Sequence, residues 1–166
     1  MIDISTFHPQ VHASNLIAHR KDQDIPTFST LLTEFRVFRK ELNIFITNYV
    51  GDDYFDFFQR LSELQYLLDS IIVKMESHAN SYFGVPYLPF FSSILNYSTS
   101  ESKLKEVTEL NCISEVVESL DSLILSTTQE GSEAMKNENY LSGSMLKDFN
   151  KELEKSRWIF YMFSKY

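Results

Sequence analysis

The chain has 166 residues and a formal net charge of -8 at pH 7, and 43% of its residues are apolar and 14% aromatic. This length suits one domain that can bury a sizeable core without disulfides or a structural metal. Four glycines, four prolines and one cysteine exclude a disulfide framework, a zinc ribbon and a β-sandwich with many tight turns, so helices are expected.

The first 26 residues show no sustained hydrophobic periodicity and contain Pro9 and Pro26, so they are predicted to form an arm or a short helix before the domain. Three of the four histidines fall in this arm: His8, His12 and His19. They can bind a metal or act as a pH-sensitive contact, but histidines in an unordered arm are usually just solvated. The predicted organisation is an arm at 1–26 and one domain at 27–166.

The sequence begins without a basic start followed by an apolar run, and no later apolar stretch is long enough to cross a bilayer. A single cysteine also fits a reducing compartment. We therefore expect a cytoplasmic protein with no membrane partner.

From Thr27 the apolar residues recur three or four positions apart up to Gly51, which predicts a long amphipathic helix that starts after Pro26. Asp52 or Asp53 can then cap a second helix that runs to about residue 81. The two apolar stripes comprise Leu31, Phe35, Phe38, Leu42, Phe45 and Tyr49 in the first helix, and Phe57, Leu61, Leu64, Leu68, Ile71 and Met75 in the second.

Gly84, Pro86 and Pro89 then interrupt the chain, and we expect a long crossover with one short helix within PFFSSILNY, residues 89–97. A third helix is predicted from a start between residues 102 and 110 to about Thr128. Its stop signal is Gly131, just beyond that end.

A fourth helix is predicted from about Glu138 to Tyr166. Four helices with one long crossover between the second and third is the connectivity of ferritin-like bundles. The expected fold class is therefore all-α, a ferritin-like four-helix bundle. Periodicity alone leaves other helical bundles open.

Three segments of the chain carry a family resemblance: LLTEFRVFRKELNIFITNYVG (31–51), GVPY (84–87) and LEKSRWIFYMF (153–163). In this order they resemble the first-helix signature, the turn after the second helix and the closing segment of Dps proteins, small members of the ferritin-like superfamily. The resemblance implies a four-helix bundle that assembles with identical copies into a twelve-subunit shell. It also implies iron oxidation at sites between two-fold-related subunits.

The iron ligands of that family fall on residues of this chain that cannot replace them. The two family histidines fall on Ile46 and Phe58, and the family aspartate and glutamate fall on Val73 and Ser77. Oxidation of Fe(II) needs imidazole and carboxylate donors that converge on the metal. We therefore expect a degenerate ferroxidase site in which these four positions form a packed subunit interface.

Glu63 and Asp69 are the candidate substitute metal ligands, since Glu63 lies near positions where family members carry acidic residues inside the shell. Glu76 and His78 are two positions apart and are expected to point to different sides of the helix, unlike the Glu-x-x-His pair of ferritin-like sites. For all these residues, a solvated acidic helix face is the alternative interpretation.

Two further positions bear on function. The aspartate of the family's entry pore falls on Ser144, which argues against efficient iron entry. Cys112 lies near the predicted start of the third helix, where it is either an activated thiol or, as we expect, a small buried residue.

Three functions are compatible with these observations. The first is a Dps-like shell protein without ferroxidase activity or cofactor, which acts as a structural or partner-binding assembly, alone or in a mixed shell with a catalytic relative. The second is a mini-ferritin that oxidises and stores iron with substitute carboxylates. The third is a helical adaptor that forms no cage. The acidic net charge and the absence of a lysine-rich tail argue against DNA binding.

Overall fold

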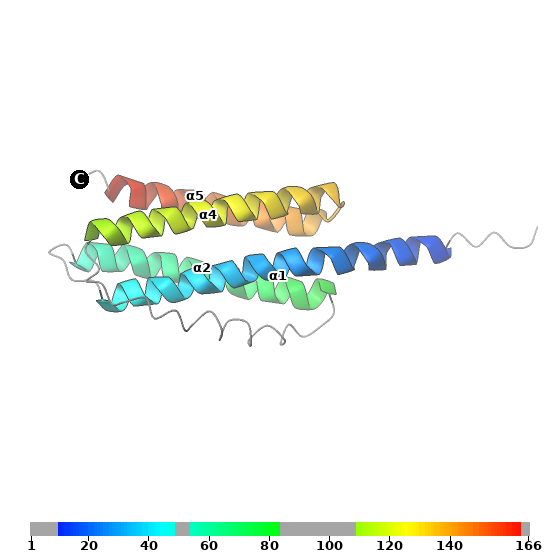
Figure 1. The fold of residues 1–166 in the computed structure, drawn as a ribbon, viewed down its shortest axis with the longest axis horizontal. Helices are drawn as coiled ribbons and strands as arrows, with labels where there is room; N and C mark the ends of the chain where they lie inside the picture. Colours follow the sequence, from blue (N-terminus) through cyan, green and yellow to red (C-terminus); the bar gives the residue numbers. More distant parts are fainter. Residues whose placement is uncertain (1–9, 49–53, 84–108, 164–166) are drawn as a thin grey trace, which may run out of the picture.

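The computed structural model describes residues 10–48, 54–83 and 109–163, and these residues form helices without any strand. The four helices are α1 (Gln10–Asn48), α2 (Tyr54–Phe83), α4 (Glu109–Lys136) and α5 (Tyr140–Phe163), shown in Figure 1. The predicted all-α class is confirmed. The crossover with its expected short helix at 89–97, and the expected caps Asp52 and Asp53, lie outside the described residues.

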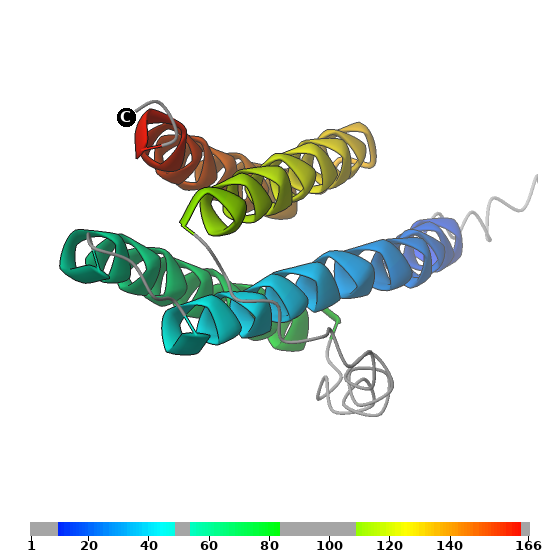
Figure 2. The same ribbon diagram turned by 60° about the vertical axis from the view of Figure 1, so that its left-hand side comes forward.

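The helices form two layers, with α1 beside α2 and α4 beside α5 (Figure 1, Figure 2). Contacts between α1 and α4, and between α2 and α5, join the layers into a bundle. Each helix directs one apolar stripe inward, as the three-or-four-residue spacing predicts. The fully buried members of these stripes include Phe35, Leu42, Phe57, Leu61, Leu68, Met75, Val116, Leu120, Leu146 and Leu153.

Aromatic and ionic contacts hold α5 in this arrangement. The ring of Phe57 on α2 meets the ring of Phe160 on α5 edge to face, with centroids 6.1 Å apart. On the outside of the second layer, Arg157 of α5 forms an ion pair with Asp121 of α4. The closing segment of the chain therefore packs against both layers.

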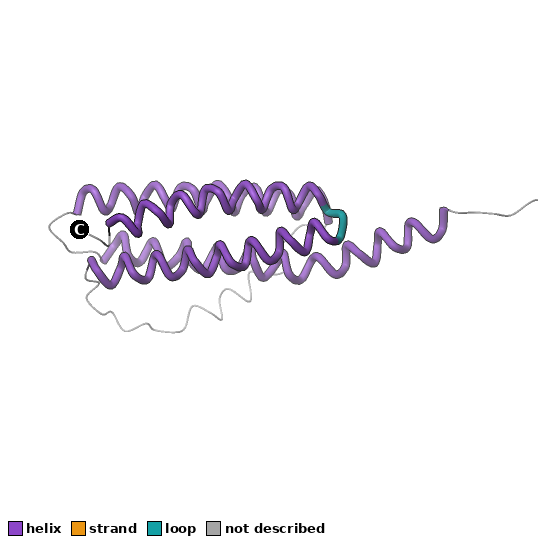
Figure 3. Tube along the Cα trace, turned by 90° about the horizontal axis from the view of Figure 1, so that it is seen from above, coloured by secondary structure: helices purple, strands orange, loops and turns teal. Residues whose placement is uncertain are grey.

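The start of α1 corrects the sequence prediction, because the helix begins at Gln10 and continues through Pro26 rather than starting after it. The proline ring lacks an N–H, so the carbonyl of Asp22 loses its helical hydrogen bond. One missing bond in a helix of 39 residues does not end it. The first turns of α1 extend beyond the other three helices (Figure 3).

The predicted stop at Gly131 is also wrong, since α4 continues to Lys136. Gly131 is tolerated inside the helix because α5 packs closely there, and a Cβ at this position would lie 3.4 Å from Cβ of Leu146. The actual end is a left-handed turn at Glu138, whose φ is 61°. Its N–H donates to the carbonyl of Met135, and the N–H of Asn139 donates to that of Ala134.

Asn139 also starts α5. Its side-chain Oδ1 accepts a hydrogen bond from the backbone N–H of Ser142 at 3.2 Å, which satisfies one of the free donors of the first turn. The predicted start near Glu138 was therefore close. None of the described helices combines the length and apolar character that a membrane span requires.

Candidate functional site

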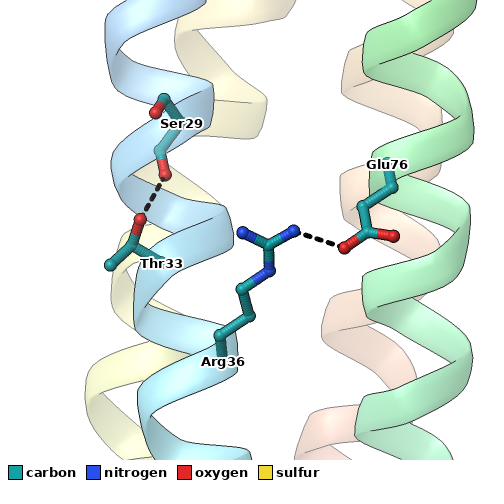
Figure 4. Close-up of polar contacts among 4 residues, drawn as sticks. All are labelled: Ser29, Thr33, Arg36 and Glu76. Carbon is teal, nitrogen blue, oxygen red and sulfur yellow. Dashed lines mark hydrogen bonds and ion pairs between the residues drawn. The ribbon is translucent and has the colours of Figure 1, made fainter. Parts of the chain in front are cut away.

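Two ion pairs join α1 to α2 along their outer surface. Nη2 of Arg36 lies 2.5 Å from Oε1 of Glu76, and Nε of Arg39 lies 2.9 Å from Oδ1 of Asp69. Figure 4 shows Arg36 reaching from α1 toward Glu76 on α2. The two arginines are three residues apart and their partners are seven apart, so the pairs tie about one turn of α1 to two turns of α2.

The same close-up shows a hydrogen bond within α1. The hydroxyl of Thr33 donates to the carbonyl of Ser29 at 3.0 Å (Figure 4). This bond uses the hydroxyl of Thr33 inside its own helix, on the turn before Arg36. The arginine side chains of α1, by contrast, reach across to α2.

The four positions that correspond to the family's iron ligands lie on α1 and α2. Ile46 is half-buried and packs against the core, whereas Ser77 is exposed. Phe58 is 36% exposed and Val73 is 62% exposed. Spacings of 15 and 4 residues put Phe58, Val73 and Ser77 on one side of α2, away from the core stripe.

Two aromatic residues that the sequence analysis did not single out extend this exposed side. Phe55 is 83% exposed and Tyr66 is 76% exposed. We call Phe55, Phe58, Tyr66 and Val73 the α2 outer stripe. The spacing of these residues by multiples of three to four was the signal in the sequence that could have identified them. Because the core stripe lies on the other side of the helix, α2 is apolar on two sides. An exposed apolar patch of this kind is typical of an interaction surface.

The carboxylate of Glu63 is engaged within α2. Gln59 donates a hydrogen bond to Oε1 at 2.9 Å, and Arg60 donates one to Oε2 at 2.8 Å. These hydrogen bonds lower the pKa of Glu63. Glu63 lies beside Glu152 and Lys155 of α5, whereas Asp69 pairs with α1. The structure therefore places the two candidate substitute ligands on different sides of α2.

Glu76 and His78 point to different neighbours, as expected from their spacing. Glu76 contacts Arg36 on α1, and Nε2 of His78 lies 2.7 Å from Oγ of Ser142 on α5. The ring of His78 also lies 5.7 Å from that of Phe28. Partial burial in this setting lowers the pKa of His78.

The residues present do not fit a di-iron carboxylate centre within the part of the chain that the structure describes. No group of three or more His, Cys, Asp or Glu side chains converges there. The acidic residues nearest the α2 outer stripe, Asp69 and Glu76, have arginine partners. Ile46, Phe58 and Val73 offer no lone pairs to a hard cation.

The other residues noted in the sequence take varied positions. Cys112 is fully buried in the core, as expected for a small packing residue. Ser144 is exposed on α5. His8 lies outside the described residues, while His12 and His19 belong to the first half of α1.

The fold is that of Dps proteins. A Dps protein from Vibrio cholerae O1, described as a member of the ferritin-like diiron-carboxylate superfamily, superposes with a TM-score of 0.77 at 15% identity, over 87% of this chain and 91% of that one. Antigen TpF1 from Treponema pallidum gives a TM-score of 0.77 at 15% identity, over 96% and 100% of the two chains.

A Dps from Microbacterium arborescens, in a high iron form, gives a TM-score of 0.76 at 10% identity, over 97% of this chain and 99% of that one. No protein-family model matches the sequence. No curated protein matches it either. The predicted ferritin-like four-helix bundle and the resemblance to Dps proteins are confirmed at the level of the fold.

Proposed function

We propose that the chain is a Dps-like shell protein that pairs with identical copies through the outer face of α1 and α2 and has lost ferroxidase activity. The observation that carries this proposal is the α2 outer stripe, which is apolar and exposed. It includes Phe58 and Val73, two of the positions at which the family resemblance implies iron ligands. Burial of such a stripe stabilises pairing by roughly 25 cal/mol per Å² of apolar surface.

The antiparallel course of α1 and α2 supports a two-fold pairing (Figure 1). Ile46 near the end of α1 and Phe58 near the start of α2 lie at one end of the layer, and Val73 and Ser77 lie toward the other. A two-fold axis across the layer sets the first pair of residues of one copy against the second pair of the other copy. In this arrangement, packed side chains fill the place between subunits where the family resemblance implies an iron site.

Loss of ferroxidase activity follows from the donors that this pairing brings together. A partner copy contributes the same residue types, and its Asp69 and Glu76 positions carry the same arginine partners. Among the α2 residues that the structure describes on this face, the pairing therefore adds no imidazole, and the carboxylates of Asp69 and Glu76 keep their cationic neighbours. In this proposal the chain needs no resident cofactor. A mixed shell in which a catalytic relative supplies the iron chemistry is compatible with it.

The family resemblance implies a closed shell of twelve copies, and the composition of the sequence favours a cytoplasmic location for it. The α2 outer stripe accounts for one isologous contact, which makes a dimer, and further contacts must join the dimers. Light scattering during gel filtration of the full chain tests this step. We expect a species much larger than a dimer, and a native mass near that of the monomer or the dimer would instead favour the helical adaptor.

A further inference from the structure

A second surface feature lies on a different side of the bundle, where α1 packs against α4. Two adjoining hollows, of about 470 Å³ and 400 Å³, share Glu41, Ser119 and Ser122 and together form one groove along the two helices. We call this the α1–α4 groove. Of the shared residues, Ser119 and Ser122 are small and hydroxyl-bearing, and Val37 and Phe38 also line the groove.

Four carboxylates line the α1–α4 groove: Glu34, Glu41, Glu115 and Glu118. Among the described residues that line it, none is a lysine, an arginine or a histidine. This composition differs from the outer face of α1 and α2, where each acidic residue of the two interhelical pairs has an arginine. The groove is thus a concentrated negative surface in the folded chain.

One carboxylate oxygen of the groove has no hydrogen-bond donor in the folded chain. Oε2 of Glu34 is shielded from solvent and accepts no hydrogen bond. Burial, together with repulsion from Glu115 across the groove, raises the pKa of Glu41. A buried carboxylate oxygen without a partner costs free energy that a cationic donor recovers. The polar groups therefore point to a ligand that brings positive charge.

We propose that the α1–α4 groove docks a lysine- or arginine-bearing α-helix of a partner protein. Glu34 and Glu41 are seven residues apart, or about 10 Å along α1. A docked helix with basic residues at i and i+7 repeats that distance, and residues at i+3 or i+4 reach the carboxylates of α4. The small side chains of Ser119 and Ser122 let the backbone of such a helix approach closely.

The inference deepens the proposed function, because it assigns a partner class to a shell that has no iron chemistry of its own. It rests on that function only for its biological meaning. The α1–α4 groove is lined by α1 and α4 of one chain, and no residue of the α2 outer stripe lines it. Peptide binding and assembly can therefore fail independently.

The test is a fluorescence anisotropy titration of the full chain at low salt with a labelled amphipathic helical peptide that carries lysines at i, i+4 and i+7. Glu34→Gln combined with Glu41→Gln should weaken binding about tenfold, which equals about 1.4 kcal/mol. The matched control combines Glu138→Gln with Glu154→Gln, which removes two exposed charges outside the groove and should leave the affinity unchanged. Added salt should weaken binding to the unaltered chain.

Several results would overturn the proposal. The first is that the lysine peptide does not bind at low salt. The second is that a peptide with glutamate in place of each lysine binds with the same affinity. The third is that the two double variants lower the affinity for the lysine peptide equally. Spermidine that binds as tightly as the peptide would assign the groove to a small polycation. A changed native mass in the Glu34→Gln and Glu41→Gln variant, with helical content retained, would make the groove a contact between copies.

Discussion

The guanidinium of Arg39 donates two hydrogen bonds to the carboxylate of Asp69, with Nε 2.9 Å from Oδ1 and Nη2 3.4 Å from Oδ2. Both side chains remain partly exposed, so water screens the pair. A double-mutant cycle with Arg39→Ala and Asp69→Ala should give a coupling energy of roughly 0.2–1 kcal/mol in urea unfolding. A cycle between Arg39 and Glu63, which lie apart, should give none. Zero coupling in the first cycle would mean that Asp69 is not held by α1.

The α2 outer stripe should control assembly without controlling folding. Val73→Asp puts a charge on a surface that pairing desolvates, so gel filtration with light scattering should show a smaller species. The exposed position limits the change in the stability of the single subunit to about 0.5 kcal/mol. Leu125→Asp on α4 is the matched control, because Leu125 is 59% exposed and lies outside the proposed interface. Equal loss of assembly in both variants would contradict the pairing.

Acidification should destabilise the chain through His78. Burial lowers the pKa of His78 in the folded state, so the unfolded state takes up a proton first, near pH 6.5. The contribution of His78 is therefore fully present above that pH and is lost as the pH falls through the folded-state value. We expect the stability of the wild type to fall faster on acidification than that of His78→Gln, which keeps a hydrogen-bonding group near Ser142. Parallel urea-derived profiles would show that His78 titrates as it does in the unfolded chain.

The turn between α4 and α5 stores backbone strain at Glu138, which has a φ of 61°. Glycine adopts this conformation without the clash of a Cβ, so Glu138→Gly should raise the free energy of unfolding by about 0.5–1 kcal/mol. Glu138→Ala keeps the Cβ and should bring no such gain. Urea unfolding of the two variants separates the backbone effect from the loss of the carboxylate. Equal stability of the Glu138→Gly and Glu138→Ala variants would contradict the claim of backbone strain at this residue.

The hydrophobic periodicity of the sequence predicted the helices and the sides of them that are buried in the core. Phe35 and Leu61 lie in apolar stripes that were visible in the sequence, and both are fully buried. Helix ends were less predictable, because local signals compete with packing. Pro26 did not start a helix and Gly131 did not end one, since neither the missing hydrogen bond nor the missing side chain outweighs the rest of a long helix.

The candidate site was predictable only in part. The positions of Ile46, Phe58, Val73 and Ser77 came from family resemblance, and their role as an interface stays a prediction. Phe55 and Tyr66 are visible as part of an outer stripe only after the core side of α2 is known. The α1–α4 groove joins residues about 80 positions apart in the sequence, so no local pattern could reveal it.

The central claim is that this fold assembles without oxidising iron. Its most direct test is aerobic addition of Fe(II) to the assembled full chain, with the oxidation followed optically and the retained iron counted after gel filtration. We predict oxidation at the rate of buffer alone and no iron in the protein peak, because the implied ligand positions carry neither imidazole nor carboxylate. Faster oxidation, with iron travelling in a large species, would contradict the account and show that other carboxylates bind the metal.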